Sequence, residues 1–360
     1  MSNERAEPAR SLAASPMYGR RAAPRDSPAE RAPYAGETYY GGPVVKAGHW
    51  RRLIITYYWV GGIAGAAQVV ATAADLAGRE RDREIVRSGR YLALGGVLVS
   101  PVLLIADLHK PARWYNMLRI VRPTSPMSLG SWALTAFGGL SGLAAVCQAA
   151  DDLMGLPGAR RAATVFGIPT AALGGIVAVY TGALTTATSV PLWAAAPRLL
   201  TALFGASASA TALASLSLSV DVLDAPEGSR RRLEALALAV GAVELGLAVA
   251  TLGAWRRRGV SAPLDAQPLK TVYRAGVLGL GVCAPLAVHV AHALTRRRSR
   301  RASLFADTAT LAGGLLLRTV VVLGGHESAA RPQDYFVLTQ PEAGAPWDQA
   351  SEVEDGEAAR

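Results

Sequence analysis

Residues Asp107–Trp132 read "DLHKPARWYNMLRIVRPTSPMSLGSW". This stretch lies between two long apolar segments, and it holds an acid, a His, several cations, two adjacent aromatic residues and a Ser/Thr/Pro turn. Lys and Arg, with Trp and Tyr, gather where a membrane meets water. Pro and Ser are residues that turn a chain. The stretch therefore predicts a membrane-edge loop that joins two spanning helices.

The composition of the chain agrees with this interpretation. The 360 residues are 51% hydrophobic and only 18% charged, whereas a soluble domain carries about 25% charged residues. The net charge is +10, but Lys and Arg occur singly and in short runs between apolar segments. That pattern favours loops that anchor at lipid headgroups and does not favour a nucleic-acid-binding surface.

Outwards from the loop, apolar stretches follow one another along most of the chain. A spanning helix needs about 20 apolar residues, and backbone groups in lipid must bond within the segment, which makes each span a helix. The sequence therefore predicts an all-α membrane protein of about eight helices in two four-helix bundles. The predicted spans are Leu53–Leu76, Gly89–Leu108, Leu129–Ala150, Ala162–Thr188, Ala196–Val222, Leu233–Trp255, Val272–Leu294 and Ser303–Gly325.

Polar tails are expected at both ends, as residues 1–48 and 327–360, with the membrane domain at residues 49–326. The N-terminus lacks the charged and apolar regions of a signal peptide, and both tails are expected to be largely disordered. An even number of spans puts both termini on one side, here called side A; the opposite side is side B. Lys and Arg are nearly balanced between the two sides, so charge does not orient the protein.

Small residues and cysteines complete the apolar pattern. Gly-rich patches at Gly61–Gly65, Gly138–Leu140, Gly174–Gly175 and Gly313–Gly314 predict close helix packing. Cys147 and Cys283 lie far apart, and no CxxC or CxxCH motif is present. The chain is therefore not expected to ligate an iron–sulfur cluster, a c-type haem or another metal. Both cysteines are expected to be buried small hydrophobes.

Ionisable residues inside spans are costly, and each is a candidate for function. Glu244 lies about eleven residues from either end of its span, near the bilayer midplane. Arg318 is the deepest cation and a candidate partner for it. Two interpretations stay open: a structural ion pair, or a proton relay towards side B. Asp107 ends its span at side A, where it either pairs with Lys110 or Arg113 or acts in a site.

The remaining polar residues support weaker predictions. Tyr180 lies about 12 Å below side A, either as a packing residue bonded to a backbone carbonyl or as a site residue. His289 and His292 lie near side B and are expected to be interfacial, since a haem needs ligands from facing helices. Acids near side B are expected to be solvated helix ends: Asp75, Asp221 and Asp307.

At this point the opening stretch is recognisable, because it resembles the signature region of the polysulfide reductase NrfD/PsrC family. Three further motifs agree in order: "YYWVGGIAGAAQ" at Tyr57–Gln68, "YTGALTTATSVPLW" at Tyr180–Trp193 and "AGGLLLRTVVVLGGHES" at Ala312–Ser328. The resemblance covers about Tyr39 to His326.

The resemblance implies a haem-free subunit that binds menaquinone or ubiquinone in a bacterial inner membrane. It also implies an iron–sulfur partner, and through it a molybdopterin or multihaem cytochrome subunit. Carried over by motif, Tyr180 would donate a hydrogen bond to the quinone and Asp107 would accept a proton. His49 and Arg318 would lie at the same site, and Glu244 stays the candidate relay. His109 stands where the family often has Gly and is expected to be dispensable.

Three alternatives remain open on the sequence. A passive membrane anchor of a redox complex would bind no quinone. A secondary transporter would have a substrate cavity between broken helices, and Pro101, Pro169 and Pro285 inside spans are compatible with one. A b-type cytochrome would show a Soret band.

Overall fold

The computed structural model describes residues 45–46, 48–78 and 80–339. In this part of the chain, eight helical segments are long and apolar enough to cross a membrane, as predicted. They are α2 (Arg52–Leu76), α3 (Arg83–Ala106), α4 (Pro126–Met154), α5 (Ala159–Thr186), α7 (Pro197–Val222), α8 (Glu227–Arg257), the continuous segment Leu269–Thr295 and α12 (Arg300–Ala329). The segment Leu269–Thr295 comprises α10 (Leu269–Thr271), η5 (Val272–Cys283) and α11 (Ala284–Thr295).

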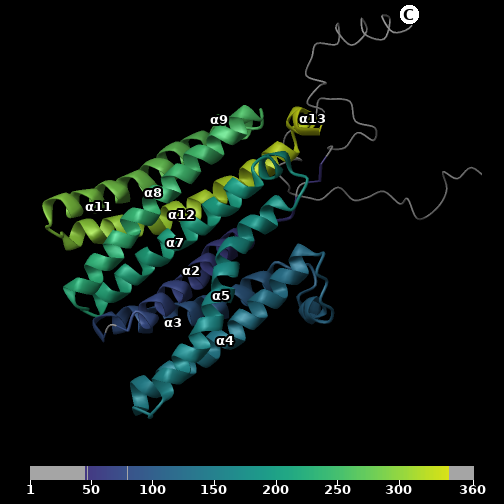
Figure 1. Ribbon diagram of the computed structural model, residues 1–360. Coiled ribbons are helices and arrows are strands. Elements are labelled where there is room, and N and C mark those ends of the chain that lie inside the picture. The colour runs from purple at the N-terminus through teal and green to yellow at the C-terminus, as the bar shows by residue number, and fades with distance from the viewer. Residues whose placement is uncertain (1–44, 47, 79, 340–360) are drawn as a thin grey trace, which may run out of the picture.

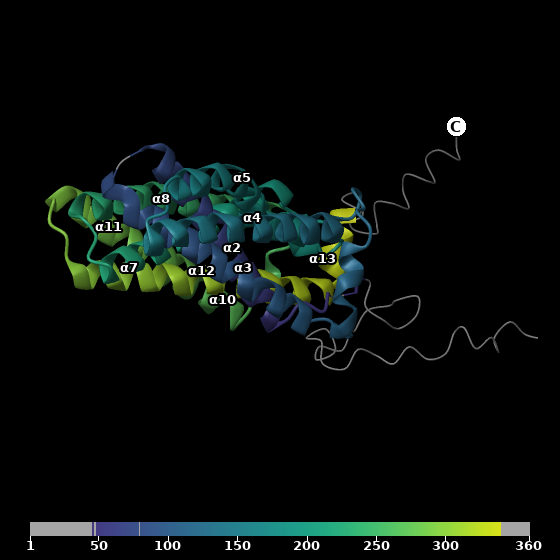
Figure 2. The same ribbon diagram turned by 90° about the horizontal axis from the view of Figure 1, so that it is seen from below.

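The eight spans form two bundles, in agreement with the prediction (Figure 1). The first bundle packs α2, α3, α4 and α5 together, and the second packs α7, α8, η5–α11 and α12. Contacts of α2 with α7 and α12, and of α5 with α7, join the two bundles. Figure 2 shows the same helices from below, running lengthwise beside one another.

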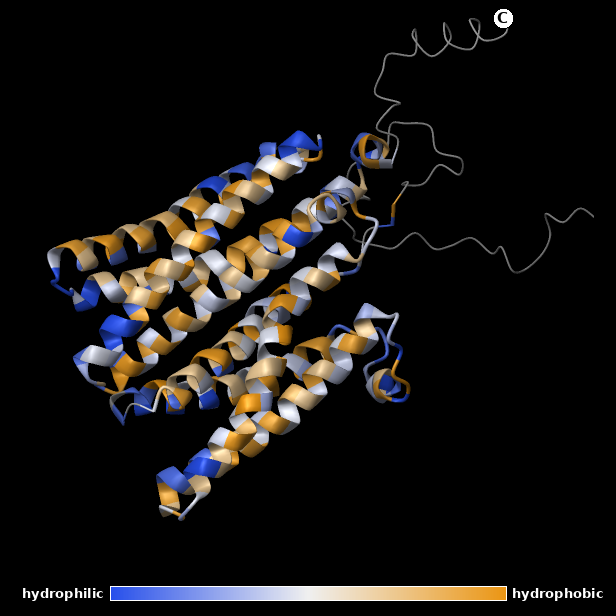
Figure 3. Ribbon diagram, viewed as in Figure 1, coloured by the Kyte–Doolittle hydropathy of each residue, from blue (hydrophilic) through white to orange (hydrophobic). Residues whose placement is uncertain are grey.

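The distribution of hydropathy along the helices matches the apolar centre and polar surfaces of a bilayer (Figure 3). The middles of the helices are mostly apolar, and hydrophilic residues gather towards their ends. Several apolar side chains in these middles point outwards, among them Leu98, Leu143 and Val243. An exposed apolar side chain is costly in water and favourable in lipid, so these outward faces are expected for a membrane protein.

The opening loop begins and ends as its residues predict. Asp107 follows α3, and the loop then forms the short helix η4 (Pro111–Leu118), none of whose residues is buried. Ser125 is the N-cap of α4, its hydroxyl accepting a hydrogen bond from the backbone N–H of Ser128 at 3.4 Å. Pro126 stands at the first helical position, where its missing N–H costs nothing. The "PTSP" turn therefore starts the third span.

Short elements lie at side A with η4. They are α6 (Pro191–Ala194), α9 (Ala262–Asp265) and α13 (Pro332–Thr339). Residues 327–339 of the predicted C-terminal tail belong to the end of α12 and to α13. The predicted N-terminal tail up to residue 44, and residues 340–360, lie outside the described residues.

Candidate functional site

A cavity of about 830 Å³ opens at side A, where the two bundles meet. One wall comes from the first turns of α2 and the residues before it, another from α12, and Asp107 joins from the end of α3. The lining residues are Gly48, His49, Trp50, Arg51, Arg52, Leu53, Ile55, Thr56, Asp107, Leu315, Thr319, Leu323 and His326. Its volume falls in the range of small-molecule sites, about 300–1,000 Å³.

The cavity is polar at one end and apolar along its length. On α12 the lining residues Leu315, Thr319, Leu323 and His326 recur every three or four residues, so they share one helix face. His326 lies at the side-A end of this face, about 16 Å along the helix from Leu315. His49 and Asp107 lie with His326 among the lining residues. A ligand with a polar head and an apolar tail matches this distribution.

His326 is a site residue that the sequence did not single out. The residue is 3% exposed, and neither ring nitrogen has a hydrogen-bond partner among the described residues, although the backbone of Gly48 lies close to it. A buried polar group without a partner is rare and costly. His326 lies on the same helix face as Leu315 and Thr319, as its spacing in the sequence predicts. This spacing points to a site only once the cavity beside that face is known.

Aromatic rings support the polar end of the cavity. Trp50 stacks on Trp193 with ring centroids 5.0 Å apart, and Trp193 lies 6.0 Å from the His326 ring. The indole N–H of Trp193 donates to the Val321 carbonyl at 2.7 Å. Gly325 makes room for this indole, since a Cβ there would lie 2.0 Å from the ring. These contacts hold α6 and α12 in fixed positions behind His326.

Asp107 is half-buried and makes no ion pair with Lys110 or Arg113, so the pairing alternative is wrong. No hydrogen bond or ion pair to its carboxyl group occurs within the described part of the chain. Burial raises the pKa of the Asp107 carboxyl above its usual range, and the charges of His109, Arg51 and His49 partly oppose this. Burial therefore makes the Asp107 carboxyl group a weaker acid than an aspartate in open water.

Tyr180 lies near this region but does not line the cavity. Its hydroxyl donates to the Pro126 carbonyl at 2.7 Å, and its ring fills the space that a side chain at position 130 would need, because a Cβ on Gly130 would lie 2.1 Å from it. The alternative of a hydroxyl bonded to a backbone carbonyl is therefore confirmed. A quinone would have to compete with Pro126 for this hydroxyl.

Arg318 is fully buried and lies outside the cavity lining. Its guanidinium donates to the Tyr58 carbonyl at 3.2 Å, the Gly314 carbonyl at 2.7 Å and the Ser207 hydroxyl at 3.0 Å. These contacts tie α12 to α2 and α7. The alternative of a direct ion pair with Glu244 is wrong, because no Glu244 oxygen lies within 4.0 Å of the guanidinium. Ser207 lies beside both groups.

Glu244 instead lines a second, small cavity in the second bundle. It is 5% exposed, and the cavity of about 20 Å³ also contacts His289 and Asp307. A space of this size holds about one water molecule. Asp307 is buried, so the prediction that it is a solvated helix end is wrong. The position of Asp307 along its helix predicts that it lies near side B. It does not predict whether the side chain faces the protein interior or the surroundings.

The other acids near side B are also buried and paired. Asp75 accepts from Arg90 at 2.6 Å, and both side chains are almost inaccessible. Asp221 pairs with Arg230 at 3.1 Å and Arg298 at 2.8 Å. These pairs join helices at side B and do not belong to the side-A cavity.

Metal ligands do not gather in the described residues, where no group of three or more His, Cys, Asp or Glu side chains could hold a metal ion. Cys283 is exposed on the outer surface, so the prediction that it is buried is wrong. Cys147 is half-buried. Because the outer surface of a span faces lipid, an apolar residue there need not be buried by protein.

The fold is that of a multi-pass helical membrane protein, and its large side-A cavity is polar at one end. Residues 45–329 match the family model described as "Polysulphide reductase, NrfD". The match covers most of the chain, and the chain belongs to this family. None of the curated proteins compared with the chain matches it.

Proposed function

We propose that the protein is the quinone-binding membrane subunit of a respiratory oxidoreductase in a bacterial inner membrane. The observation that carries this proposal is the side-A cavity, in which His49, Asp107 and His326 stand at one end of an apolar channel. Menaquinone and ubiquinone share this pattern, with two carbonyl groups on a ring that bears an apolar tail. The residues therefore fit the group.

The residues at the polar end of the cavity have different roles in this proposal. When bound, a quinone supplies redox chemistry in which two electrons and two protons are exchanged. The unpartnered imidazole of His326 is placed to hydrogen-bond one carbonyl or hydroxyl oxygen of the ring, and His49 lies on the same cavity. Asp107 is the proton acceptor, because its carboxyl group has a raised pKa and no competing partner among the described residues. Leu315 and Leu323 face the tail.

Electrons would be exchanged with a partner subunit at side A. The chain has only two cysteines, fewer than the four thiolates that usually hold an iron–sulfur cluster. An iron–sulfur partner docked beside the cavity would supply the one-electron carrier, with a molybdopterin or multihaem cytochrome subunit beyond it. A passive anchor would need no cavity with a polar head, and the cavity favours quinone chemistry over that alternative.

Glu244 is proposed to carry protons between the midplane and side B. It shares a water-sized cavity with His289 and Asp307, and His289 also lines the larger side-B cavity that contains Glu234 and His292. Titratable side chains thus follow one another from the midplane towards the surface. Because Arg318 is held by other groups, Glu244 is not needed to neutralise it through direct contact.

Cavity filling tests the quinone site directly. Thr319→Phe adds bulk to the cavity wall, whereas Thr308→Phe makes the same change on an exposed face of α12. Both threonines bond the carbonyl four residues earlier, so the pair is matched. Binding of a short-chain ubiquinone or menaquinone is measured by quenching of tryptophan fluorescence in detergent.

We expect Thr319→Phe to weaken quinone binding tenfold or more and Thr308→Phe to leave it unchanged. Asp107→Asn should bind quinone but lower turnover by about 10²–10⁴, the range for removal of a general base. Equal affinity in all variants would move the site away from this cavity, and no binding by the wild-type protein would favour the passive anchor.

A further inference from the structure

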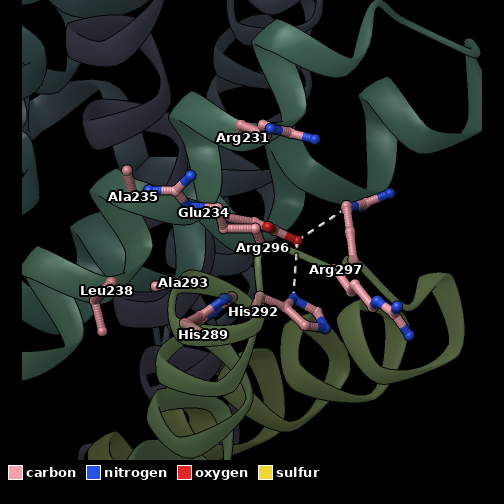
Figure 4. A pocket seen from close by; sticks show the side chains of 10 residues that line it. Arg231, Glu234, Ala235, Leu238, His289, His292, Ala293, Arg296 and Arg297 are labelled. Atoms are coloured by element: carbon pink, nitrogen blue, oxygen red, sulfur yellow. Dashed lines mark hydrogen bonds and ion pairs between the residues drawn. The ribbon is translucent and has the colours of Figure 1, made fainter.

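A second large cavity, of about 280 Å³, lies at side B between α8 and α11. The residues that line it are Arg231, Glu234, Ala235, Leu238, His289, His292, Ala293, Arg296, Arg297 and Arg298. In Figure 4 the Arg231 side chain comes from the start of α8, and the His292 side chain reaches towards Glu234 from α11. The cavity is remote from the quinone site, which lies at the other end of the helices.

The cavity carries excess positive charge. Its one acid, Glu234, is already matched, because Arg298 lies 2.8 Å from it and the His292 imidazole 3.3 Å from it. Arg231 has only an exposed pairing with Glu227 at 3.2 Å. Arg296 and Arg297 have no acidic partner among the residues that the structure describes. Three guanidinium groups are therefore available to an anion, and guanidinium is the group that binds phosphate oxygens best.

Arg296 adds a conformational observation. It ends α11 in the left-handed region, with φ of 55°, a position where helices usually carry Gly because other residues pay a steric cost. Arg296 is also one of the residues that line the cavity. Nearby arginines differ, since Arg230 and Arg232 pair with the buried acids Asp221 and Asp82 and serve to join helices.

The place of the cavity indicates the kind of anion. α8 begins at Glu227 and α11 ends at Thr295, so the arginines stand where the apolar spans end. Besides the arginines and histidines, the lining contains the apolar side chains of Ala235, Leu238 and Ala293. Leu236 and Leu294 are exposed on the two flanking helices and face lipid. A ligand here meets cations in the cavity and exposed apolar side chains on the flanking helices.

We propose that this cavity binds the phosphate headgroup of an anionic phospholipid, with its acyl chains along α8 and α11. Basic pockets between spanning helices are recognised sites for such headgroups. Free phosphate would satisfy the arginines but would gain nothing from the apolar lining or from Leu236 and Leu294.

A matched pair of variants tests the proposal on the full-length protein in detergent. Arg296→Gln/Arg297→Gln removes two cavity cations, and Arg300→Gln/Arg301→Gln removes two exposed cations from the same basic run outside the lining. Ala293→Trp fills the cavity without a change in charge. Native mass spectrometry then measures the binding of cardiolipin, phosphatidylglycerol and phosphatidylcholine, and inorganic phosphate is tested as a competitor.

We expect the wild-type protein to prefer the two anionic lipids to phosphatidylcholine. Arg296→Gln/Arg297→Gln should weaken their binding about 30-fold, which corresponds to about 1 kcal/mol for each arginine near the membrane surface. Ala293→Trp should lose the same preference, and Arg300→Gln/Arg301→Gln should keep most of it. Equal losses of lipid binding in the two double variants would show that general surface charge binds the lipid, and would overturn the proposal. Competition by millimolar inorganic phosphate would also overturn it.

Discussion

The side-A cavity holds polar groups that the fold leaves without partners. His326 is buried with both ring nitrogens unpaired in the described structure, and the Asp107 carboxyl group is likewise without a bonded partner. Leaving a buried group such as the His326 imidazole unsatisfied costs about 1–3 kcal/mol. A ligand that bonds the His326 imidazole would remove this cost, and it could bond the Asp107 carboxyl group in the same cavity. The two residues define the site more sharply than any motif does.

Arg51 provides a test of Asp107 as the proton acceptor. Its positive charge favours the carboxylate and lowers the pKa of Asp107, against the upward effect of burial. Arg51→Gln removes that charge, so the pKa of Asp107 should rise further, and the carboxyl group should stay protonated to higher pH. We expect the acidic limb of the pH profile of quinol oxidation to move towards higher pH in Arg51→Gln.

Arg52→Gln is the matched control, because Arg52 also lines the cavity but is not among the groups that shift Asp107. Its profile should keep the wild-type position. A profile that is unchanged in Arg51→Gln, or that moves equally in both variants, would argue that another group accepts the proton.

Arg318 and Glu244 should respond differently to conservative substitution. Arg318→Lys replaces the fork that binds Tyr58, Ser207 and Gly314, and an ammonium cannot reproduce that geometry. We expect a loss of about 1.5–3 kcal/mol in the free energy of unfolding. Glu244→Gln should fold with near wild-type stability, because it leaves those bonds in place, but should abolish the vesicle pH response that accompanies quinone turnover.

Thermal unfolding in detergent and turnover in reconstituted vesicles separate the two roles. If Glu244→Gln unfolds as readily as Arg318→Lys, then Glu244 is structural. If it folds and its vesicle pH response equals that of the wild type, the proton route through Glu244 is wrong.

At the scale of helices, glycine determines how closely two spans approach. A Cβ on Gly65 of α2 would lie 2.3 Å from the Gly174 carbonyl of α5, whereas a Cβ on Gly139 of α4 would meet nothing within 4 Å. We expect Gly65→Ala to destabilise the protein by about 1–3 kcal/mol through overpacking. Gly139→Ala should be neutral or slightly stabilising. Thermal unfolding of both variants is the measurement, and equal midpoints would show that α2 and α5 can shift apart at little cost.

The same contacts show what the sequence could predict and what it could not. Length and hydropathy were enough for the eight spans, because the bilayer imposes one simple requirement on each of them. Close packing at Gly65 and at Gly313 was also predicted and is confirmed, but Gly139 faces open space. Which face of a helix meets protein and which meets lipid depends on the neighbours, because both surroundings are apolar.

The candidate site was harder to predict for the same reason. Asp107 and His49 were placed on the correct side and do meet in one cavity, because helix direction alone determines the side. Helix direction does not determine rotation about the axis, so Arg318 and Tyr180 were expected beside them but bond protein groups instead. The π-helical turns of η5 change which face of that span each following residue occupies. No residue in the span predicts this change.

On the scale of the whole molecule, the side-A cavity, which is the proposed quinone site, forms at the junction between the two bundles. Its walls come from α2 in the first bundle and α12 in the second, with the end of α3 beside them. The short elements η4, α6, α9 and α13 lie at the same end of the molecule. A partner that docks on side A would therefore stand within a short distance of the polar end of the cavity, as electron exchange requires.

The exposed helix η4 is the part of side A most suited to meet that partner. It has no buried residue, and Trp114 and Tyr115 are 45% and 53% exposed. Aromatic side chains of this kind often carry binding energy at interfaces, at more than about 1 kcal/mol each. We expect Trp114→Ala/Tyr115→Ala to lower the iron that copurifies with the protein from native membranes by tenfold or more, while the variant still inserts and binds quinone.

The opposite end of the first bundle supplies the control. Leu153 and Met154 close α4 at side B and are more exposed than either aromatic residue, at 83% and 70%. Leu153→Ala/Met154→Ala removes a comparable apolar patch from the side that the proposed partner does not touch, so copurified iron should stay at the wild-type level. Aromatic residues at a membrane edge also anchor helices at the headgroups. If iron is retained in both variants, Trp114 and Tyr115 serve that anchoring role, and the partner must dock on α6, α9 or α13 instead.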